Sequence, residues 1–404
     1  MVKVDYLDVH FSSDDAVYFA GQEMSGRLVL ILKEEKQINE VLLEIKGTAK
    51  TYWTKHSGKS RKHCSDSEPY FCEQFNTDFT HKFEKKDDDQ GRTIPAGRHE
   101  IPFSYSLSKT LPSSFEGDYG YVRYTCTATL ERPWDFDIVA RRAFTVVGIE
   151  DINEDTKALD PVRLSDSNFD IRFCCRKQGT ISVNVALSRT GYAPGENVVV
   201  NAEVSNESQK TLRYSCARIK QHTCYRAKTF AGHEETKQSS KVIVKKEKGE
   251  IGARSNIKWS NDKLPIPPVP PKLARCRIID ISYTLEFEVD PGIVVISPLI
   301  IGTIPLSQES RLANHLRLAQ KSSKEQITVT VTDSEGQMVE PETAQKKRVR
   351  MPSSVLSELY PGLAAPAFRD SMFGKTDISI SKESNVIFGE AKFAPKYPCY
   401  CDLK

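Results

Sequence analysis

The clearest alternation of hydrophobic and polar positions in this chain lies between Tyr121 and Leu130. Every second residue there is apolar and the residues between them are polar or charged, which is the period of a half-buried β-strand. The Gly117-Asp118 pair precedes the run and Pro133 follows it, so turn residues bound the strand. The expected buried face comprises Val122, Tyr124, Cys126, Ala128 and Leu130.

The same alternation returns between Ile279 and Val289, just before a turn at residues 290–292. Short runs of this kind recur in both halves of the chain, whereas no long run has the spacing of an amphipathic helix. This pattern predicts an all-β chain with two antiparallel β-sandwiches. Further strands are expected within residues 17–32, 38–53, 141–149, 293–296 and 299–304.

An internal repeat indicates two copies of one domain. Three pairs of residues recur at the same separation of 174 positions. A repeat of this length is too long for a solenoid unit, so it indicates the duplication of a whole domain. The pairs are Tyr18 and Tyr192, Gly21 and Gly195, and Ile45 and Ile219.

Changes in composition mark the domain boundaries. Residues 150–166 are polar and contain Pro161, which is typical of a linker. Residues 333–350 have too little apolar content to fold alone, so disorder with embedded recognition motifs is expected there. The expected organisation is a first sandwich at residues 1–150, a linker at 151–167, a second sandwich at 168–308 and a largely irregular tail at 309–404.

Charge and hydrophobicity limit the cellular setting. The net charge of +3 is too balanced to argue for a nucleic-acid partner, so none is expected. The first residues lack the apolar core of a signal peptide. The most hydrophobic run, residues 293–304, is interrupted by Pro298 and Gly302 and is shorter than the roughly 20 residues that cross a bilayer. With ten cysteines expected to be reduced thiols, the sequence predicts a soluble, cytosolic protein.

Residues 56–89 form a polar, charge-rich insertion. We interpret it as a solvated hairpin loop, because short charge runs are usually solvated, with phosphate or acidic-peptide binding as the alternative. Two histidines and two cysteines in it could ligate zinc, but the seven residues between the cysteines exceed the usual spacing of structural sites. No metal is therefore expected at His63, Cys64, Cys72 and His81.

Several ordered motifs run through both halves. The first half contains GYVRY at residues 120–124 and LERPW at 130–134. The second half contains FCC at 173–175, GY and PGE between 191 and 196, IPP at 266–268 and IGTIPL at 301–306. Over roughly residues 1–308 the chain resembles the arrestins, and in particular the α-arrestins, or arrestin-domain-containing proteins. The resemblance implies two tandem arrestin-like antiparallel β-sandwiches followed by a mostly irregular C-terminal tail.

The same resemblance implies a cytosolic adaptor, without enzymatic activity or a cofactor, in membrane-protein trafficking and endocytosis. The implied partners are cytoplasmic regions of membrane proteins, with WW-domain ubiquitin ligases or clathrin adaptors as candidate recruits. Peripheral association with the plasma membrane or endosomes is compatible with this role. Exposed edges of the sandwich sheets would suit the addition of a peptide strand.

The tail contains short candidate recognition motifs. Many α-arrestins recruit WW-domain ligases through P-P-x-Y, which is missing here, and the remnants APKY and YPCY at residues 394–400 keep one proline each. Because a WW groove packs prolines between aromatic rings, the loss of one is expected to weaken docking. YPGL at 360–363 has the form of an endocytic sorting signal, against the alternative of a stretch without a partner. The candidate residues are Tyr360, Leu363, Pro395, Tyr397, Pro398 and Tyr400.

A proline-rich stretch, PPVPPK at residues 267–272, fits the P-x-x-P-x-K form of an SH3 ligand. Its candidate contacts are Pro267, Pro270 and Lys272. Rigid proline turns between strands are common, and the resemblance places an inter-strand loop here. We therefore favour a structural loop over an SH3 ligand.

No catalytic residue is assigned, because the chain lacks a glycine-rich phosphate loop, a G-x-S-x-G elbow, H-E-x-x-H and C-x-x-C. The alternative function is a thiol-dependent redox or signalling regulator that acts through protein binding, which requires an exposed cysteine of low pKa. The Cys174-Cys175 pair could be palmitoylated, although packing against a core strand is more usual. The family's thioredoxin-binding member uses a reactive cysteine, but the matching residues 252–259 contain none, so thioredoxin binding is not inferred.

Overall fold

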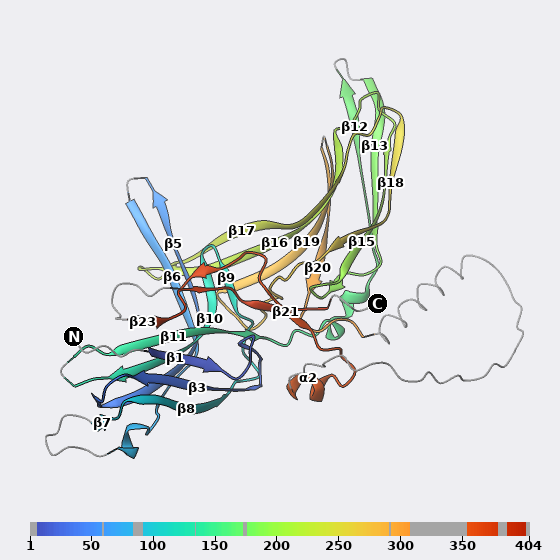
Figure 1. Ribbon diagram of the computed structural model, residues 1–404. Helices are drawn as coiled ribbons and strands as arrows, with labels where there is room; N and C mark the ends of the chain where they lie inside the picture. Colours follow the sequence, from blue (N-terminus) through green and yellow to red (C-terminus); the bar gives the residue numbers. More distant parts are fainter. Residues whose placement is uncertain are drawn as a thin grey trace, which may run out of the picture.

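The computed structural model describes residues 6–58, 60–83, 92–133, 135–172, 176–290, 292–307, 354–378 and 386–400. Two elongated β-sandwiches meet in a bent arrangement, and strands from both belong to one 12-stranded sheet (Figure 1). A smaller sheet completes each sandwich. The predicted all-β class with two tandem sandwiches is therefore confirmed.

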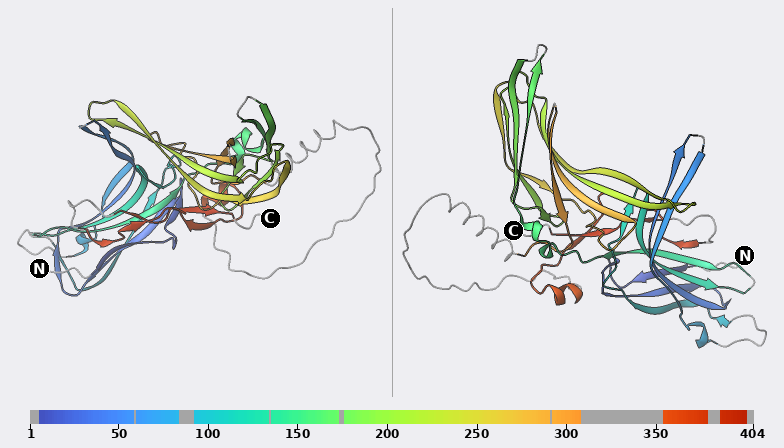
Figure 2. Two further views of the ribbon diagram at one scale, coloured as in Figure 1. Left: turned by 90° about the horizontal axis from the view of Figure 1, so that it is seen from above. Right: turned by 180° about the vertical axis from the view of Figure 1, so that it is seen from behind.

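The N-terminal sandwich pairs its small sheet with one half of the long sheet. Its elements are β1 (Tyr6–Phe11), β2 (Val17–Phe19), β3 (Glu23–Leu32), β4 (Lys36–Ile38), β5 (Glu40–Ser57), β6 (Ser60–Asn76), η1 (Thr80–Lys82), β7 (Arg92–Ile94), β8 (Gly97–Ser106), β9 (Phe115–Gly117), β10 (Gly120–Glu131) and β11 (Ile138–Val147). The small sheet has the order β1-β3-β8, and the long sheet runs through β6-β5-β10-β11-β2. Much of the insertion at residues 56–89, which was predicted as a solvated hairpin loop, is β-strand. β5 and β6 form a long hairpin that projects from the body (Figure 2).

The C-terminal sandwich follows the 3-10 helices η2 (Ile152–Glu154) and η3 (Thr156–Leu159). Its strands are β12 (Val162–Arg172), β13 (Arg176–Leu187), β14 (Gly191–Tyr192), β15 (Asn197–Asn206), β16 (Tyr214–Thr229), β17 (Glu234–Lys248), β18 (Ser255–Pro265), β19 (Ile279–Asp290) and β20 (Ile293–Ile301). The small sheet has the order β12-β13-β15-β18, and the long sheet runs through β14-β20-β19-β16, with β17 beside β16. The long sheet crosses between domains where the end of β16 pairs with β6.

The alternating strand that the sequence predicts at residues 121–130 is β10. It pairs with β5 on one side and with β11 on the other. All five residues of its predicted apolar face are fully buried, and the hydroxyl of Tyr124 donates to the carbonyl oxygen of Pro112 at 2.7 Å. On the polar face, Arg123 donates to both carboxylate oxygens of Glu116, at 2.7 and 2.8 Å. The period-2 pattern therefore predicted both the strand and its buried side.

The repeat of 174 positions corresponds to equivalent places in the two sandwiches. Tyr18 in β2 and Tyr192 in β14 lie on short strands that pair in parallel with β11 and β20. Gly21 and Gly195 follow them with φ values of +88° and +93°, a conformation that favours glycine. β19 pairs with β16 and β20 as β10 pairs with β5 and β11, so the predicted duplication is visible in the strand order.

The described C-terminal residues fold back onto both sandwiches (Figure 1). They form α2 (Ser354–Leu359), β21 (Ala367–Asp370), β22 (Thr376–Asp377), β23 (Val386–Gly389), β24 (Lys392–Phe393) and β25 (Lys396–Cys399). β21 pairs with β25, β22 pairs with β24, and β23 adds to the long sheet in parallel with β11. Within the described parts of the chain, no helix has the length and apolar character to span a membrane.

Candidate functional site

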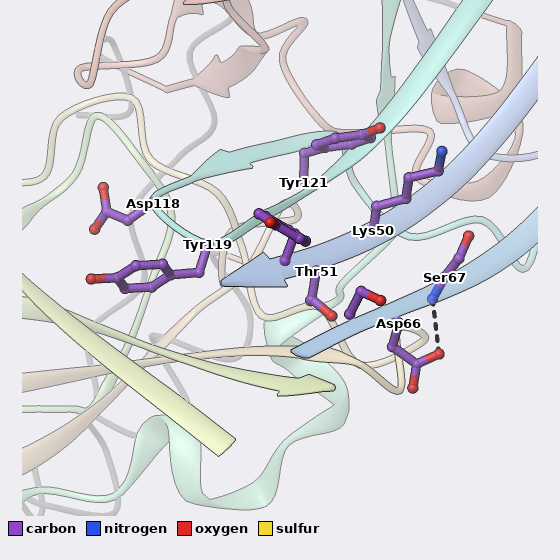
Figure 3. Close-up of a pocket in the computed structure, with 10 residues that line it drawn as sticks. Lys50, Thr51, Asp66, Ser67, Asp118, Tyr119 and Tyr121 are labelled. Atoms are coloured by element: carbon purple, nitrogen blue, oxygen red, sulfur yellow. Dashed lines mark hydrogen bonds between the residues drawn. The ribbon is translucent and has the colours of Figure 1, made fainter. Parts of the chain in front are cut away.

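A groove of about 770 Å³ lies where the β5–β6 hairpin meets the turn between β9 and β10 (Figure 3). We call it the junction groove. Its lining residues come from β5, from β6, and from the β9–β10 turn with the first residues of β10. Gly120 allows β5 and β10 to approach, since a Cβ there would lie 2.5 Å from the carbonyl oxygen of Lys50. Tyr119 and Tyr121 point in opposite directions in Figure 3. The lining residues are Lys50, Thr51, Tyr52, Ser65, Asp66, Ser67, Asp118, Tyr119, Gly120 and Tyr121.

Side chains of the C-terminal sandwich hold the β9–β10 turn that borders this groove. The hydroxyl of Tyr225 in β16 accepts a hydrogen bond from the backbone N–H of Asp118 at 3.1 Å. Lys241 in β17 forms an ion pair with the Asp118 carboxylate at 2.6 Å, and the ammonium of Lys237 lies 3.9 Å from the ring centroid of Tyr119. The turn between β9 and β10 is therefore held by side chains of the other domain.

We expect the substitution Tyr225→Phe to loosen the turn between β9 and β10 while the fold is kept. The ring still packs edge-on against Tyr119, but the N–H of Asp118 loses its acceptor. Loss of one such hydrogen bond is expected to reduce the free energy of unfolding by about 1 kcal/mol. Hydrogen exchange at Asp118, compared with exchange in the core of β10, measures the local effect. Unchanged exchange at Asp118 would show that Lys241 alone positions the turn.

The chemistry of the junction groove suits a polypeptide ligand. Lys50 and Asp66 supply charges of opposite sign, and Asp118 adds a carboxylate that is paired with Lys241. Tyrosine rings supply apolar surface, and Ser65 and Ser67 supply hydroxyl groups. Among the described residues, no group of histidine, cysteine and acidic side chains could hold a metal ion. Sequence reasoning missed this groove, and its main sequence signal is the pair of tyrosines that flanks Gly120 on the predicted strand.

The candidate tail residues Tyr397, Pro398 and Tyr400 are buried against the body. Tyr397 is 1% exposed and its hydroxyl donates to the carbonyl oxygen of Ser114 at 2.9 Å. Tyr400 donates its hydroxyl to the carbonyl oxygen of Thr303 at 2.8 Å. Pro395 is also buried, and its carbonyl oxygen accepts from the N–H of Ser371. In this conformation a WW groove cannot reach these side chains, so their recognition by a ligase stays a prediction.

The candidate sorting signal at residues 360–363 forms a turn rather than the extended strand by which such signals are read. The N–H of Leu363 donates to the carbonyl oxygen of Tyr360 at 3.0 Å, and Pro361-Gly362 occupies the central positions that favour a β-turn. Tyr360 and Leu363 both pack against a small apolar cluster at the domain junction. Burial, and then Asp151, raises the pKa of Tyr360 above its ordinary value. Use of this signal by an adaptor stays a prediction.

The proline-rich stretch at residues 267–272 connects β18 to β19. Pro270 is buried, Pro267 is half-buried and Lys272 is exposed. The hydroxyl of Tyr283 donates to the carbonyl oxygen of Pro270, which fixes the loop on the core. An SH3 groove needs access to both prolines of P-x-x-P, so this arrangement agrees with the favoured structural loop.

The thiols show little of the chemistry that the redox alternative needs. Cys72 is exposed, but burial of its thiol and the neighbouring Glu44 raise its pKa above the ordinary value. Burial likewise raises the pKa of Cys216 and Cys276. The Cys174-Cys175 pair lies outside the described residues.

Comparison with known proteins identifies the family. Residues 7–153 match the family model "Arrestin (or S-antigen), N-terminal domain" and residues 177–306 match "Arrestin (or S-antigen), C-terminal domain". Arrestin domain-containing protein 17 of Caenorhabditis elegans is 48% identical over 430 aligned positions, which cover 100% of both chains. This chain belongs to the arrestin-domain-containing proteins.

More distant relatives match about three quarters of the chain. Mouse arrestin domain-containing protein 4 is 28% identical over 296 residues, which cover 72% of this chain and 69% of the relative. Human thioredoxin-interacting protein is 22% identical over 309 residues, which cover 74% and 75% of the two chains. The predicted arrestin resemblance is thus confirmed.

Proposed function

We propose that this arrestin-domain-containing protein is a non-enzymatic adaptor that binds cytoplasmic segments of membrane proteins during their trafficking and endocytosis. The observation that carries the proposal is the junction groove, whose walls are already braced by Tyr225 and Lys241 of the second sandwich. A preformed site lowers the entropy lost on binding. Membership of the arrestin family supports the adaptor role, and the proposal includes a cytoplasmic location with recruitment to the plasma membrane or endosomes.

The junction groove would hold an extended peptide. The tyrosine rings provide flat surfaces for apolar side chains, and large aromatic residues are frequent anchors at interfaces. Lys50 and Asp66 would select for complementary charges on the segment. The tail residues Tyr360, Tyr397 and Tyr400 take part in the proposal only after displacement from the body, when a WW-domain ligase or clathrin adaptor could reach them.

The experiment is quantitative affinity capture from cells that express the full chain or the variant Asp66→Lys/Tyr119→Ala, whose two residues line the junction groove. We expect the variant to lose most membrane-protein partners, because a charge is reversed and an aromatic wall is removed. Lys263→Glu, which reverses an exposed charge on β18 outside the groove, is the matched control and should keep them. Recovery of the same membrane proteins with all three chains would refute the groove as the binding site. Recovery of none with the unaltered chain would refute the adaptor function.

The thiol-dependent alternative receives no support from the described cysteines. It predicts rapid alkylation of an exposed thiol, whereas burial and Glu44 raise the pKa of Cys72 and so disfavour its thiolate. Thioredoxin-interacting protein is 22% identical to this chain, and this likeness alone does not carry a thiol-dependent function over. Fast alkylation of Cys72 in the native protein near neutral pH would revive this alternative.

A further inference from the structure

A second, smaller hollow of about 120 Å³ opens on the outer face of the long sheet, next to the junction groove. It shares Lys50 and Tyr121 with that groove. Alternate residues of β5, β10 and β11 point to one face of the sheet, which brings Lys46, Arg123 and Arg141 together. We call this hollow the cationic pocket.

Positive charge dominates the cationic pocket. Four cations line it, Lys46, Lys50, Arg123 and Arg141, against the single carboxylate of Glu44. Arg123 is neutralised by its two hydrogen bonds to Glu116. Within the described parts of the chain, no acidic side chain lies within ion-pair distance of the other three cations. The pocket therefore carries a local excess of positive charge.

Arg141 is in the least favourable position of the four. It is half-buried, and its Nε donates a hydrogen bond to the hydroxyl of Thr127 at 3.0 Å. Burial lowers the pKa of its guanidinium, and the neighbouring Arg123 lowers it further, although Glu44 acts in the opposite direction. Partial burial of a cation beside another cation is unfavourable unless an anion neutralises them.

The size and shape of the pocket restrict that anion. Its volume corresponds to roughly four water molecules at about 30 Å³ each, which is room for one compact tetrahedral group. Ile378 of the C-terminal segment lines one side, so the chain itself already occupies that edge of the pocket. Arginine forks and lysine ammonium groups are the side chains that proteins use for phosphate oxygens.

We propose that the cationic pocket binds a single phosphate group, held by Arg141, Lys46 and Lys50 beneath residue Ile378. The phosphate is either free inorganic phosphate or the headgroup of a phosphorylated lipid, since both present the same oxygens. This site does not depend on cargo binding in the junction groove, because the anion alone is the probe. The two proposals can therefore fail separately.

Titration of the full chain with inorganic phosphate at constant ionic strength tests the proposal, with binding followed by calorimetry. We expect saturable binding to one site, and Arg141→Gln or Lys46→Gln should weaken it by about tenfold or more, since each removes a charge-assisted hydrogen bond. Arg98→Gln removes an exposed arginine that is paired with Glu100 in the same sandwich, and should bind phosphate normally. Chloride in place of phosphate should give no saturable heat.

A variant that adds a carboxylate to the pocket distinguishes the loss of a phosphate site from the loss of folding. Thr125 lines the pocket, so Thr125→Glu places a carboxylate among the cations. We expect it to abolish phosphate binding and to raise the midpoint of thermal unfolding, whereas Thr125→Gln should do neither. Phosphate binding that survives both Thr125→Glu and Arg141→Gln would overturn the proposal.

Vesicles distinguish the source of the phosphate group. The full chain is sedimented with phosphatidylcholine vesicles that contain or lack a phosphatidylinositol phosphate. Binding that needs both the phosphorylated lipid and Arg141, without binding of free phosphate, assigns the pocket to a lipid headgroup. Binding of free phosphate assigns it to the soluble ion. Absence of binding in both arms overturns the proposal.

Discussion

Replacement of Tyr397 by alanine is expected to release the C-terminal segment from the body while both sandwiches stay folded. The side chain is fully buried, and its hydroxyl donates to the carbonyl oxygen of Ser114. Truncation of a large buried aromatic residue costs about 3–5 kcal/mol of packing free energy. The segment lies on the outside of the sandwiches and its strands β21 and β25 pair with each other, so it should undock locally instead of unfolding the domains.

The thiol of Cys399 reports on this release. Cys399 is 3% exposed beside Tyr397, whereas Cys126 is buried in the core of β10. We expect rapid alkylation of Cys399 in Tyr397→Ala, with Cys126 still protected. The control Tyr397→Phe keeps the ring and loses one hydrogen bond, worth about 1 kcal/mol, so its Cys399 should stay protected.

Gly389→Ala provides an independent test of the same docking. Gly389 has a φ of +114°, and a Cβ there would collide with the carbonyl oxygen of Arg141. The substitution should break the pairing of β23 with β11 and speed up alkylation of Cys399. Protection of Cys399 in both variants would contradict docking through these anchors. Equal exposure of Cys126 would mean that the segment unfolds together with the sandwich.

Sequence periodicity predicted the β-scaffold, because successive side chains of a half-buried strand point alternately to the core and to solvent and are therefore alternately apolar and polar. Val122 to Leu130 and Ile279 to Val289 alternate with the period of the pleat, and both strands were found as β10 and β19. The repeat from Tyr18 to Tyr192 predicted equivalent positions in the two domains, because the same local turn is needed at each. Local chemistry alone fixes these features.

The docking of the tail and the junction groove could not be predicted from periodicity, because the residues that meet there are distant in the sequence. Tyr397 is buried only because Ser114 and its neighbours are presented by a folded N-terminal sandwich. Asp118 is placed by Tyr225, which lies on another domain. Aromatic residues in a polar tail are a signal of docking, but the surface that they meet depends on tertiary packing.

Replacement of Arg123 by alanine is expected to lower the free energy of unfolding by about 3–5 kcal/mol, because it leaves the buried carboxylate of Glu116 unpaired. The side chain of Glu116 is 6% exposed and that of Arg123 is 15% exposed. Burial already raises the pKa of Glu116 in the intact protein, even though Arg123 opposes that rise. Denaturant unfolding of the two chains measures the difference.

The loss of stability in Arg123→Ala should depend on pH in a defined direction. Without Arg123 the folded-state pKa of Glu116 rises further above its unfolded value of about 4.3. A raised folded-state pKa favours the folded state at low pH, and this contribution is lost as the pH rises through that pKa. The deficit relative to the unaltered chain should therefore be larger at neutral pH than at acidic pH.

A double variant separates the unpaired charge from lost packing. Glu116→Leu/Arg123→Met removes both charges and keeps apolar volume, so it should be far less destabilised than Arg123→Ala and should show little of its pH dependence. If both variants lose the same stability at every pH, the contribution of Arg123 lies in the contact of its guanidinium with Tyr121, which both variants lose and in which the guanidinium carbon lies 3.9 Å from the ring centroid, and not in neutralising Glu116.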